Sequence, residues 1–395
     1  MHGILGELKE RKETLRPTTP PKESGPSVLL CETTEDYWEA MTSTYLDQYV
    51  DALGTATFRS VSFPLSRSAA ASIVGIHATA RGAAGDGEER LEALLDMVLS
   101  EPSSPLAALA AGVDTALGEL GGEQPGFVRL SSRSPKDAVL FVPGFATMLA
   151  ECEAQIVEAD AQQQQQQQCH QEAGDSESSA TNTRLRALYE ASTRAMAIHS
   201  GRDALRLLIL SARILDDLTT YVGDAGMPDM AVFVRAFRVF PVELELRAFV
   251  FNNNYTALTQ YNPCVYVPRL ARAKEALEAH VGAFMEAFVE ARTLGLDSYV
   301  LDLILTPAEY GSPESVQTLY DDISQLEIIV CEANPMAEFA GSGLFRFEDE
   351  GDRDILLGKS GFEFRVVEGE GEVEVVENLQ DEWAQYLGNN DHSSS

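Results

Sequence analysis

Three side chains with oxygen ligands interrupt two apolar segments in the C-terminal half of the chain. Asp302 lies inside 299–305, a run that otherwise consists of apolar β-formers, while Glu332 and Asn334 end the run LEIIVCEANP. Residues two apart in an extended strand share a face, so Glu332 and Asn334 project to the same side. A carboxylate buried in an apolar strand is costly unless it is paired or bound to a metal, and oxygen ligands suit Mg²⁺. We therefore predict that Asp302, Glu332 and Asn334 converge on one hard cation.

Positive charge gathers in the segment FVRLSSRSPKDAVLFV, which contains Arg129, Arg133 and Lys136. The pattern predicts a strand over 127–130, a tight polar loop, and a second strand over 139–142. Cations next to serine hydroxyls suit a phosphate group. The alternative is a polar hairpin tip whose cations pair with carboxylates of this acidic chain, and the residues alone favour that alternative.

Composition limits the classes of partner. The 395 residues include 62 acidic and 29 basic side chains, for a net charge of -33. This excess argues against direct nucleic-acid binding and against anionic membrane surfaces, and it favours a basic protein partner or simply solubility. The five cysteines have no CxxC spacing, so neither a disulfide framework nor a zinc site is indicated. Since no apolar run is long enough to span a bilayer, we expect a cytoplasmic protein.

The positioning elements follow from periodicity. Helical spacing of apolar residues predicts helices over 35–53, 88–99, 185–198, 201–214 and 268–291. Runs of β-formers predict further strands over 59–65, 231–237, 245–251 and 255–260, the last two joined by an Asn-rich turn. In the strand over 245–251, Arg247 alternates with apolar residues, so it either faces a ligand or is a surface or salt-bridged arginine. The segment 155–183 contains a glutamine run and is predicted to be a disordered insertion, and the ends 1–26 and 388–395 to be disordered tails.

Several of these segments together resemble a known family. The runs FVRLSSRSPKDA, RVFPVELELRAFVFNNNYTALTQYN, YVLDL, CEANP and GFEFRVVE occur in the order seen in the cell division cycle protein 123 family. The similarity extends over about residues 60–368. It implies an α+β fold of the ATP-grasp-like type, in which two lobes clamp ATP and Mg²⁺ between mixed or antiparallel sheets. It also implies a monomeric cytosolic protein that assists assembly of heterotrimeric translation initiation factor 2 by binding its gamma subunit.

The resemblance also implies roles for particular residues. It assigns phosphate contacts to Arg129, to Ser134, Pro135 and Lys136 in the loop that follows it, and to Arg247 in the predicted strand over 245–251. Backbone groups that contact adenine are expected from the strand residues Phe233, Val234 and Arg235. The expected ligands of Mg²⁺ are Asp302, Glu332 and Asn334. The chain departs from the family pattern at Arg129, where the family has lysine, at Ser131 and Ser132, and at Glu332, where the family has aspartate. It implies no catalytic residue.

The expected organisation is an N-terminal lobe over 27–230 and a C-terminal ATP-binding lobe over 231–387. Two classes of function remain open. The first is an ATP-binding assembly chaperone, and the second is an ATP-grasp ligase that activates a carboxylate as an acyl phosphate. Near the C-terminus, Glu368, Glu370, Glu372 and Glu374 alternate with small or apolar residues. They form either a solvated tail or a docking face for the gamma subunit.

Overall fold

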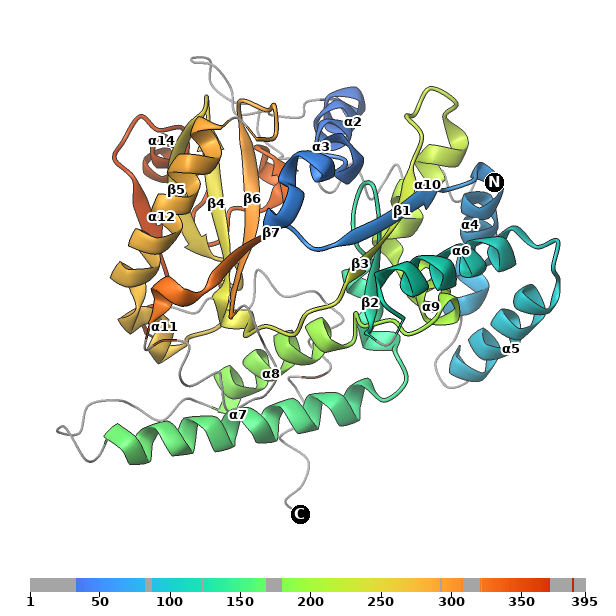
Figure 1. Cartoon of the computed structure of the whole chain (residues 1–395), viewed down its shortest axis with the longest axis horizontal. Helices are drawn as coiled ribbons and strands as arrows, with labels where there is room; N and C mark the ends of the chain where they lie inside the picture. The colour runs from blue at the N-terminus through green and yellow to red at the C-terminus, as the bar shows by residue number, and fades with distance from the viewer. Residues whose placement is uncertain are drawn as a thin grey trace.

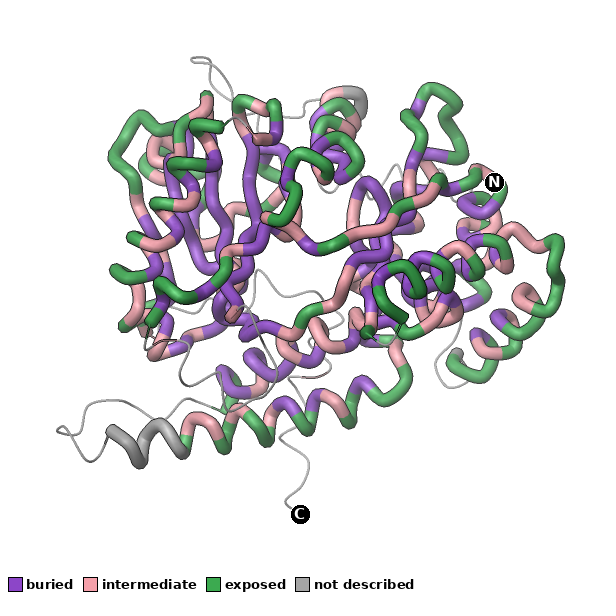
Figure 2. The backbone as a smooth tube through the Cα atoms, viewed as in Figure 1, coloured by how far each residue is buried: buried purple, intermediate pink, exposed green. Residues whose placement is uncertain are grey.

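The computed structural model describes residues 33–81, 87–122, 124–167, 180–291, 293–307, 320, 322–369 and 386. Within these residues the chain forms two β-sheets with helices around them (Figure 1). The three-stranded sheet has the order β1-β3-β2, and the five-stranded sheet has the order β7-β6-β4-β5-β8. The central strands of the larger sheet are buried along most of their length (Figure 2). The α+β organisation predicted from the sequence is therefore confirmed.

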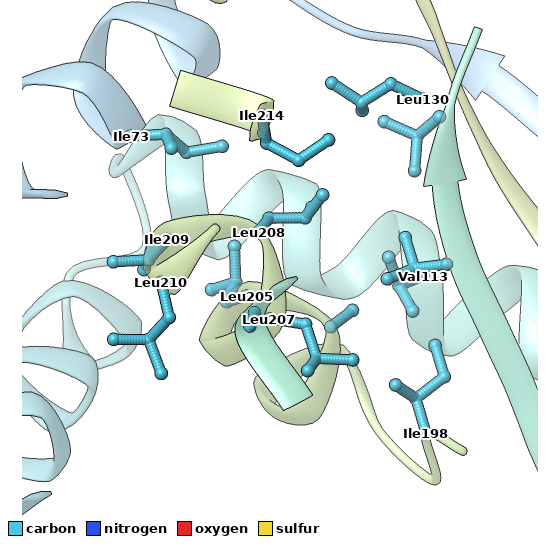
Figure 3. Close-up of a cluster of buried hydrophobic side chains, with 14 of the residues drawn as sticks. Ile73, Val113, Leu130, Ile198, Leu205, Leu207, Leu208, Ile209, Leu210 and Ile214 are labelled. Atoms are coloured by element: carbon cyan, nitrogen blue, oxygen red, sulfur yellow. The ribbon is translucent and has the colours of Figure 1, made fainter. Parts of the chain in front are cut away.

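The smaller sheet belongs to the N-terminal lobe. Its strands are β1 (Ser60–Pro64), β2 (Gly126–Leu130) and β3 (Ala231–Ala236), and β3 pairs antiparallel with both neighbours. The surrounding helices are α4 (Arg67–Arg81), α5 (Gly87–Ser100), α6 (Pro105–Leu120), α9 (Gly201–Leu210) and α10 (Ala212–Gly223). Branched side chains from these helices and from β2 form a dense apolar cluster (Figure 3). This cluster fixes β2 and α10, which both reach the site described below.

The larger sheet forms the C-terminal lobe. Its strands are β4 (Glu245–Phe251), β5 (Asn254–Gln260), β6 (Tyr299–Thr306), β7 (Glu327–Pro335) and β8 (Glu363–Arg365). All pairings are antiparallel except the one between β5 and β8. Asn252 and Asn253 join β4 to β5 with φ angles of 50 and 59, a conformation that asparagine tolerates better than most residues. The predicted hairpin is thus confirmed.

Several predicted helices are divided in two. The helix predicted over 35–53 is α2 (Thr34–Ser43) followed by α3 (Leu46–Leu53), because Tyr45 is extended and the amide of Leu46 donates to the carbonyl of Ser131 at 2.9 Å. The helix over 201–214 breaks at Ser211, which caps α10 through Ile214 N. The helix over 268–291 is α11 (Pro268–Arg272) and α12 (Lys274–Glu290), interrupted at Ala273.

Two other expectations about local structure are wrong. The strand predicted over 139–142 is replaced by the 3-10 helix η2 (Lys136–Phe141), because Ala138, Val139 and Leu140 turn into the N-terminal core directly after Pro135. The predicted disordered insertion 155–183 is instead helical at both ends, in α7 (Phe145–Gln167) and α8 (Ala180–Arg194), which lie side by side (Figure 1). The Asp160 carboxylate pairs with Arg186 at 2.6 Å, a contact that composition could not reveal. Residues 168–179 and the predicted tails lie outside the described residues.

The boundary between the lobes also differs from the expected one at residue 230. Since β3 is the central strand of the smaller sheet, the crossover between the sheets is the segment 237–244, which includes the 3-10 helix η3 (Val242–Leu244). An N-terminal helix also contacts the larger sheet. The helix α3 packs on β7, and the Tyr49 hydroxyl accepts a hydrogen bond from Ala333 N at 2.8 Å. Among the described helices, none combines the length and apolar character needed to cross a membrane.

Candidate functional site

A cavity of about 280 Å³ lies between the two sheets. Its wall draws on β2 and β3 from the smaller sheet and on β4, β6 and β7 from the larger one. Most of the lining side chains are charged or aromatic. The charged ones are Arg129, Lys136, Arg213, Arg235, Arg238, Glu245 and Glu332, and the aromatic ones are Phe58, Phe127, Tyr189, Phe237, Phe240 and Tyr261.

The charge in this cavity has the opposite sign to that of the whole protein. Five cationic side chains face two carboxylates there, although the chain as a whole has a net charge of -33. Aromatic rings beside the cations provide flat apolar surface that suits a planar group. The combination is typical of a site for an anionic ligand with an aromatic portion.

Glu332 on β7 is the anionic centre of the cavity. One carboxylate oxygen, Oε2, accepts a hydrogen bond from Arg129 Nη1 at 2.8 Å, and Oε1 lies 3.6 Å from Lys136 Nζ. Burial alone would raise the pKa of Glu332, but the charges of Lys136 and Arg129 outweigh burial and lower that pKa. Glu332 therefore stays ionised and serves as an internal counter-ion for Arg129 on β2 and for Lys136, the first residue of η2.

Asp302 on β6 is paired directly across from Glu332 in the sheet register. Arg247 on β4 binds both of its oxygens, at 2.7 Å and 2.9 Å, and Asn334 Nδ2 donates to Oδ2 at 3.0 Å. Burial raises the pKa of Asp302, and the Arg247 charge opposes this shift. Tyr261 connects this group to the previous one, because its hydroxyl accepts a hydrogen bond from Lys136 at 2.9 Å and its ring lies 4.9 Å from the Arg247 guanidinium.

The structure thus brings together most of the predicted site residues, in two adjacent groups. Arg129, Ser134, Lys136, Arg235 and Glu332 line the cavity, while Arg247, Asp302 and Asn334 form the hydrogen-bonded group beside it. Two loop residues behave differently. Pro135 begins η2 and does not line the cavity, and the Arg133 guanidinium pairs with Asp217 at 2.8 Å and with Tyr37, as in the alternative interpretation of the loop.

The backbone role expected for Phe233, Val234 and Arg235 is not available. These residues pair with β1 on one side and with β2 on the other, so their amide and carbonyl groups already belong to the sheet. The side chain of Arg235 still reaches the cavity, where it donates to the carbonyl of Cys331 at 2.7 Å. The segment that follows β3 contributes Phe237 and Phe240 to the cavity wall instead.

The three predicted metal ligands are of the chemical type that suits a hard cation, since Asp302, Glu332 and Asn334 bear carboxylate and amide oxygens on neighbouring strands. Both oxygens of Asp302 are bound by Arg247, so Glu332 is the carboxylate of this set that faces the cavity. In the described part of the chain, no group of three or more His, Cys, Asp or Glu residues is arranged to hold a metal by itself. Mg²⁺ commonly takes one or two protein carboxylates and completes its coordination with substrate phosphates and water.

Sequence reasoning missed several lining residues. Glu245 was seen only as part of a strand, yet burial raises its pKa to about 7 against the opposing charge of Lys136. Arg213 and Tyr261 are distant in sequence from the loop 131–136 and reach the same cavity only through the tertiary fold. The aromatic residues of FRVFPVE, Phe237 and Phe240, were the one available sequence signal.

Comparisons with known proteins bear on the fold and the family of the chain. The chain shares 12% sequence identity with the structure of Cdc123 from Schizosaccharomyces pombe, over 83% of this chain and 97% of that one, with a TM-score of 0.49. A C-terminally truncated form of the same protein matches with 11% identity, over 83% and 98% of the two chains, with a TM-score of 0.51, which supports the ATP-grasp-like fold. No curated protein matches the sequence. The D123 family model matches residues 187–386, half of the chain, and the protein therefore belongs to the D123 family, the family of Cdc123.

Proposed function

We propose that this protein binds ATP together with Mg²⁺ in the cavity between its two sheets. The observation that carries the proposal is the concentration of five cations and several aromatic rings in one cavity of a strongly acidic chain. The aromatic wall that includes Phe237 and Phe240 suits the base. The cationic wall that includes Arg129 and Lys136 suits the phosphates.

Binding requires the ion pairs of the cavity to exchange partners. Arg129 and Lys136 contact Glu332, so a phosphate group would compete with that carboxylate for them. Glu332 would hold Mg²⁺, which would supply charge neutralisation for the phosphates. Arg129 and Lys136 would then contact the phosphate oxygens, while the more deeply buried Asp302 stays bound to Arg247 and Asn334.

Thermal unfolding with and without ligand tests this proposal. A ligand that binds only the folded state stabilises it by about 2.7 kcal/mol at roughly 100 times its dissociation constant. We expect ATP with Mg²⁺ to raise the melting temperature, and adenosine to raise it less because adenosine leaves the cations unused. An unchanged melting temperature at saturating ATP and Mg²⁺ would refute nucleotide binding.

We also propose that the protein acts in the cytoplasm as an assembly chaperone that binds the gamma subunit of translation initiation factor 2. Family membership and the net charge of -33 support a basic protein partner. Affinity capture with the whole chain, followed by mass spectrometry, should recover that subunit, and less of it as salt increases from low to physiological concentration. Recovery of no initiation-factor subunit, together with release of phosphate that depends on an added amine acceptor, would favour the ligase instead.

The acidic C-terminal segment is the proposed docking face for that subunit. Of its four glutamates, the structure describes Glu368, whose carboxylate lies 2.7 Å from Lys274 Nζ, while Glu370, Glu372 and Glu374 lie outside the described residues. Changing all four to Gln should slow capture of the gamma subunit at low salt, since rim charges mainly accelerate association. An unchanged, salt-insensitive capture rate would place the docking face elsewhere.

A further inference from the structure

Arg213 differs from the other cations of the cavity. Arg129 and Lys136 contact Glu332, Arg238 pairs with Glu327 at 3.3 Å, and the Arg235 guanidinium donates to neutral oxygens such as that of Cys331. In the part of the chain that the structure describes, the guanidinium of Arg213 has no hydrogen-bond acceptor and no ion-pair partner, although it lines the same cavity. A half-buried cation without an acceptor has unmet capacity for an anion.

The backbone around Arg213 is held in place by hydrogen bonds to Asp137 in η2. Asp137, the residue after Lys136, accepts hydrogen bonds from Ser211 Oγ at 2.5 Å, Ala212 N at 2.7 Å and Arg213 N at 3.2 Å. Its carboxylate therefore already satisfies the N-terminus of α10, and the free group at this point is the Arg213 side chain.

A second contact joins the same two elements. Arg133 in the loop pairs with Asp217 one turn further along α10. The segment 133–137 and α10 are thus joined by the contacts of Asp137 and by the Arg133–Asp217 pair, and these contacts hold Lys136 and Arg213 on one wall of the cavity. Positions fixed in this way lower the entropic cost of binding an anion between them.

Arg213 also acts on the anionic centre of the cavity. Burial favours the neutral form of Glu332, and the charges of Lys136, Arg129 and Arg213, in that order, lower its pKa against burial. Arg213 therefore belongs to the cationic wall around Glu332, yet no salt bridge within the described residues holds it there. It can meet an incoming anion without first losing a carboxylate partner.

We propose that Arg213 is a binding residue for the phosphate chain of the nucleotide, and that it can bind this chain while Arg129 and Lys136 are still paired with Glu332. This inference rests on the proposed ATP binding and adds to it a residue on α10. It predicts that the contribution of Arg213 is greatest when Mg²⁺ is absent, because the other two cations are then still paired.

The test is a calorimetric titration of the full chain with adenosine, AMP, ADP and ATP, in EDTA and again with Mg²⁺. Wild-type protein is compared with Arg213→Ala, Arg213→Lys and, as a control that also removes one positive charge, Lys359→Ala. Lys359 is an exposed residue whose partner is Asp354 at 3.2 Å, and it does not line the cavity. Melting curves without ligand establish that each variant is folded.

In EDTA we expect Arg213→Ala to bind ATP about tenfold more weakly than wild type, the effect of one lost charge-assisted hydrogen bond. Its affinity for adenosine should be unchanged, Arg213→Lys should recover part of the loss, and Lys359→Ala should match wild type. Equal ATP affinity of Arg213→Ala and wild type in EDTA would overturn the role of Arg213 while leaving ATP binding intact. An equal loss for adenosine and ATP would overturn it as well. If wild type binds no nucleotide under either condition, both this inference and the proposed function fail.

Discussion

The two carboxylates that face each other across β6 and β7 have opposite environments. Glu332 opens onto the cavity, contacts the two cations Arg129 and Lys136, and has a lowered pKa in spite of burial. Asp302 is almost fully buried, is held by Arg247 through two oxygens, and has a pKa raised by burial. Two positions paired across the same sheet therefore differ in their surroundings, since Glu332 faces the cavity and Asp302 is enclosed by its hydrogen-bond partners.

The free-energy cost of removing the hydrogen-bond and ion-pair partners should differ between the two carboxylates. A buried charge that loses its counter-ion retains the full cost of desolvation, whereas a charge at a cavity wall can be met by water or by a ligand. We therefore expect changes at the Asp302 group to affect mainly folding, and changes at the Glu332 group to affect mainly binding.

The largest effect is expected for Arg247→Ala, which leaves the Asp302 carboxylate buried without its charged partner. We predict a loss of about 3–5 kcal/mol in the free energy of unfolding, measured by urea denaturation. Replacing both partners at once, as Arg247→Met with Asp302→Leu, should restore much of this loss because no uncompensated charge is then buried. A loss below about 1 kcal/mol for Arg247→Ala would mean that the Asp302 group contributes little to the stability of the fold.

The next effect is on the metal dependence of binding. Glu332→Gln removes the charge that holds Arg129 and Lys136, so ATP should bind about tenfold more tightly in EDTA than it binds to wild type. The gain from adding Mg²⁺ should shrink at the same time. Equilibrium titrations in both conditions measure the two quantities, and an unchanged affinity in EDTA would show that Glu332 does not compete with phosphate.

The pH dependence of the unfolding free energy should depend on Glu245, whose pKa is affected by both Asp302 and Glu332. Burial raises the pKa of Glu245 to about 7, Lys136 opposes the shift, and the negative charges of Asp302 and Glu332 add to it. Because this pKa lies above the value of about 4.5 in the unfolded chain, the native state holds an extra proton between these pH values. The contribution of Glu245 to stability is therefore complete below about pH 4.5 and is lost as pH rises to 7.

The variant Glu245→Gln should remove that dependence. Its unfolding free energy relative to wild type should increase from about pH 5 to pH 7 and then level off, by an amount of order 1–3 kcal/mol. Urea denaturation at a series of pH values measures this difference. A difference that stays constant over the range would show that Glu245 is ionised in the folded protein throughout.

The smallest effect is expected far from both carboxylate groups. Replacing residues 168–179 with a short Gly-Ser linker should change neither ATP binding nor, by more than about 0.5 kcal/mol, the free energy of unfolding, because the segment is polar and of low complexity. Extending the deletion back to residue 160 should cost more, since it removes the ion pair between Asp160 and Arg186. Equal effects of the two deletions would contradict a stabilising role for that pair.

Sequence reasoning located the strands of the larger sheet because apolar runs, a lone Asp302 and the Asn-rich turn are local signals. It also placed Asp302, Glu332 and Asn334 together, since polar residues that interrupt two neighbouring apolar strands lie side by side in the sheet. It could not show that Glu332 pairs with Arg129, about 200 positions away, because that contact depends on how the two lobes meet. The helix breaks at Tyr45 and Ser211 were also hidden, since the contacts that stabilise them come from other elements.

Photolabelling with 8-azido-ATP, followed by peptide mapping, tests most directly whether the cavity between the sheets is the nucleotide site. The azide sits on the base, so we predict that the label is found on peptides containing the aromatic wall, such as Phe58, Phe127 or the Phe237–Phe240 segment. Excess unlabelled ATP should suppress this labelling. Labelling that ATP does not suppress, or labelling confined to a different surface such as the groove along α12 beside Tyr255, would contradict the account.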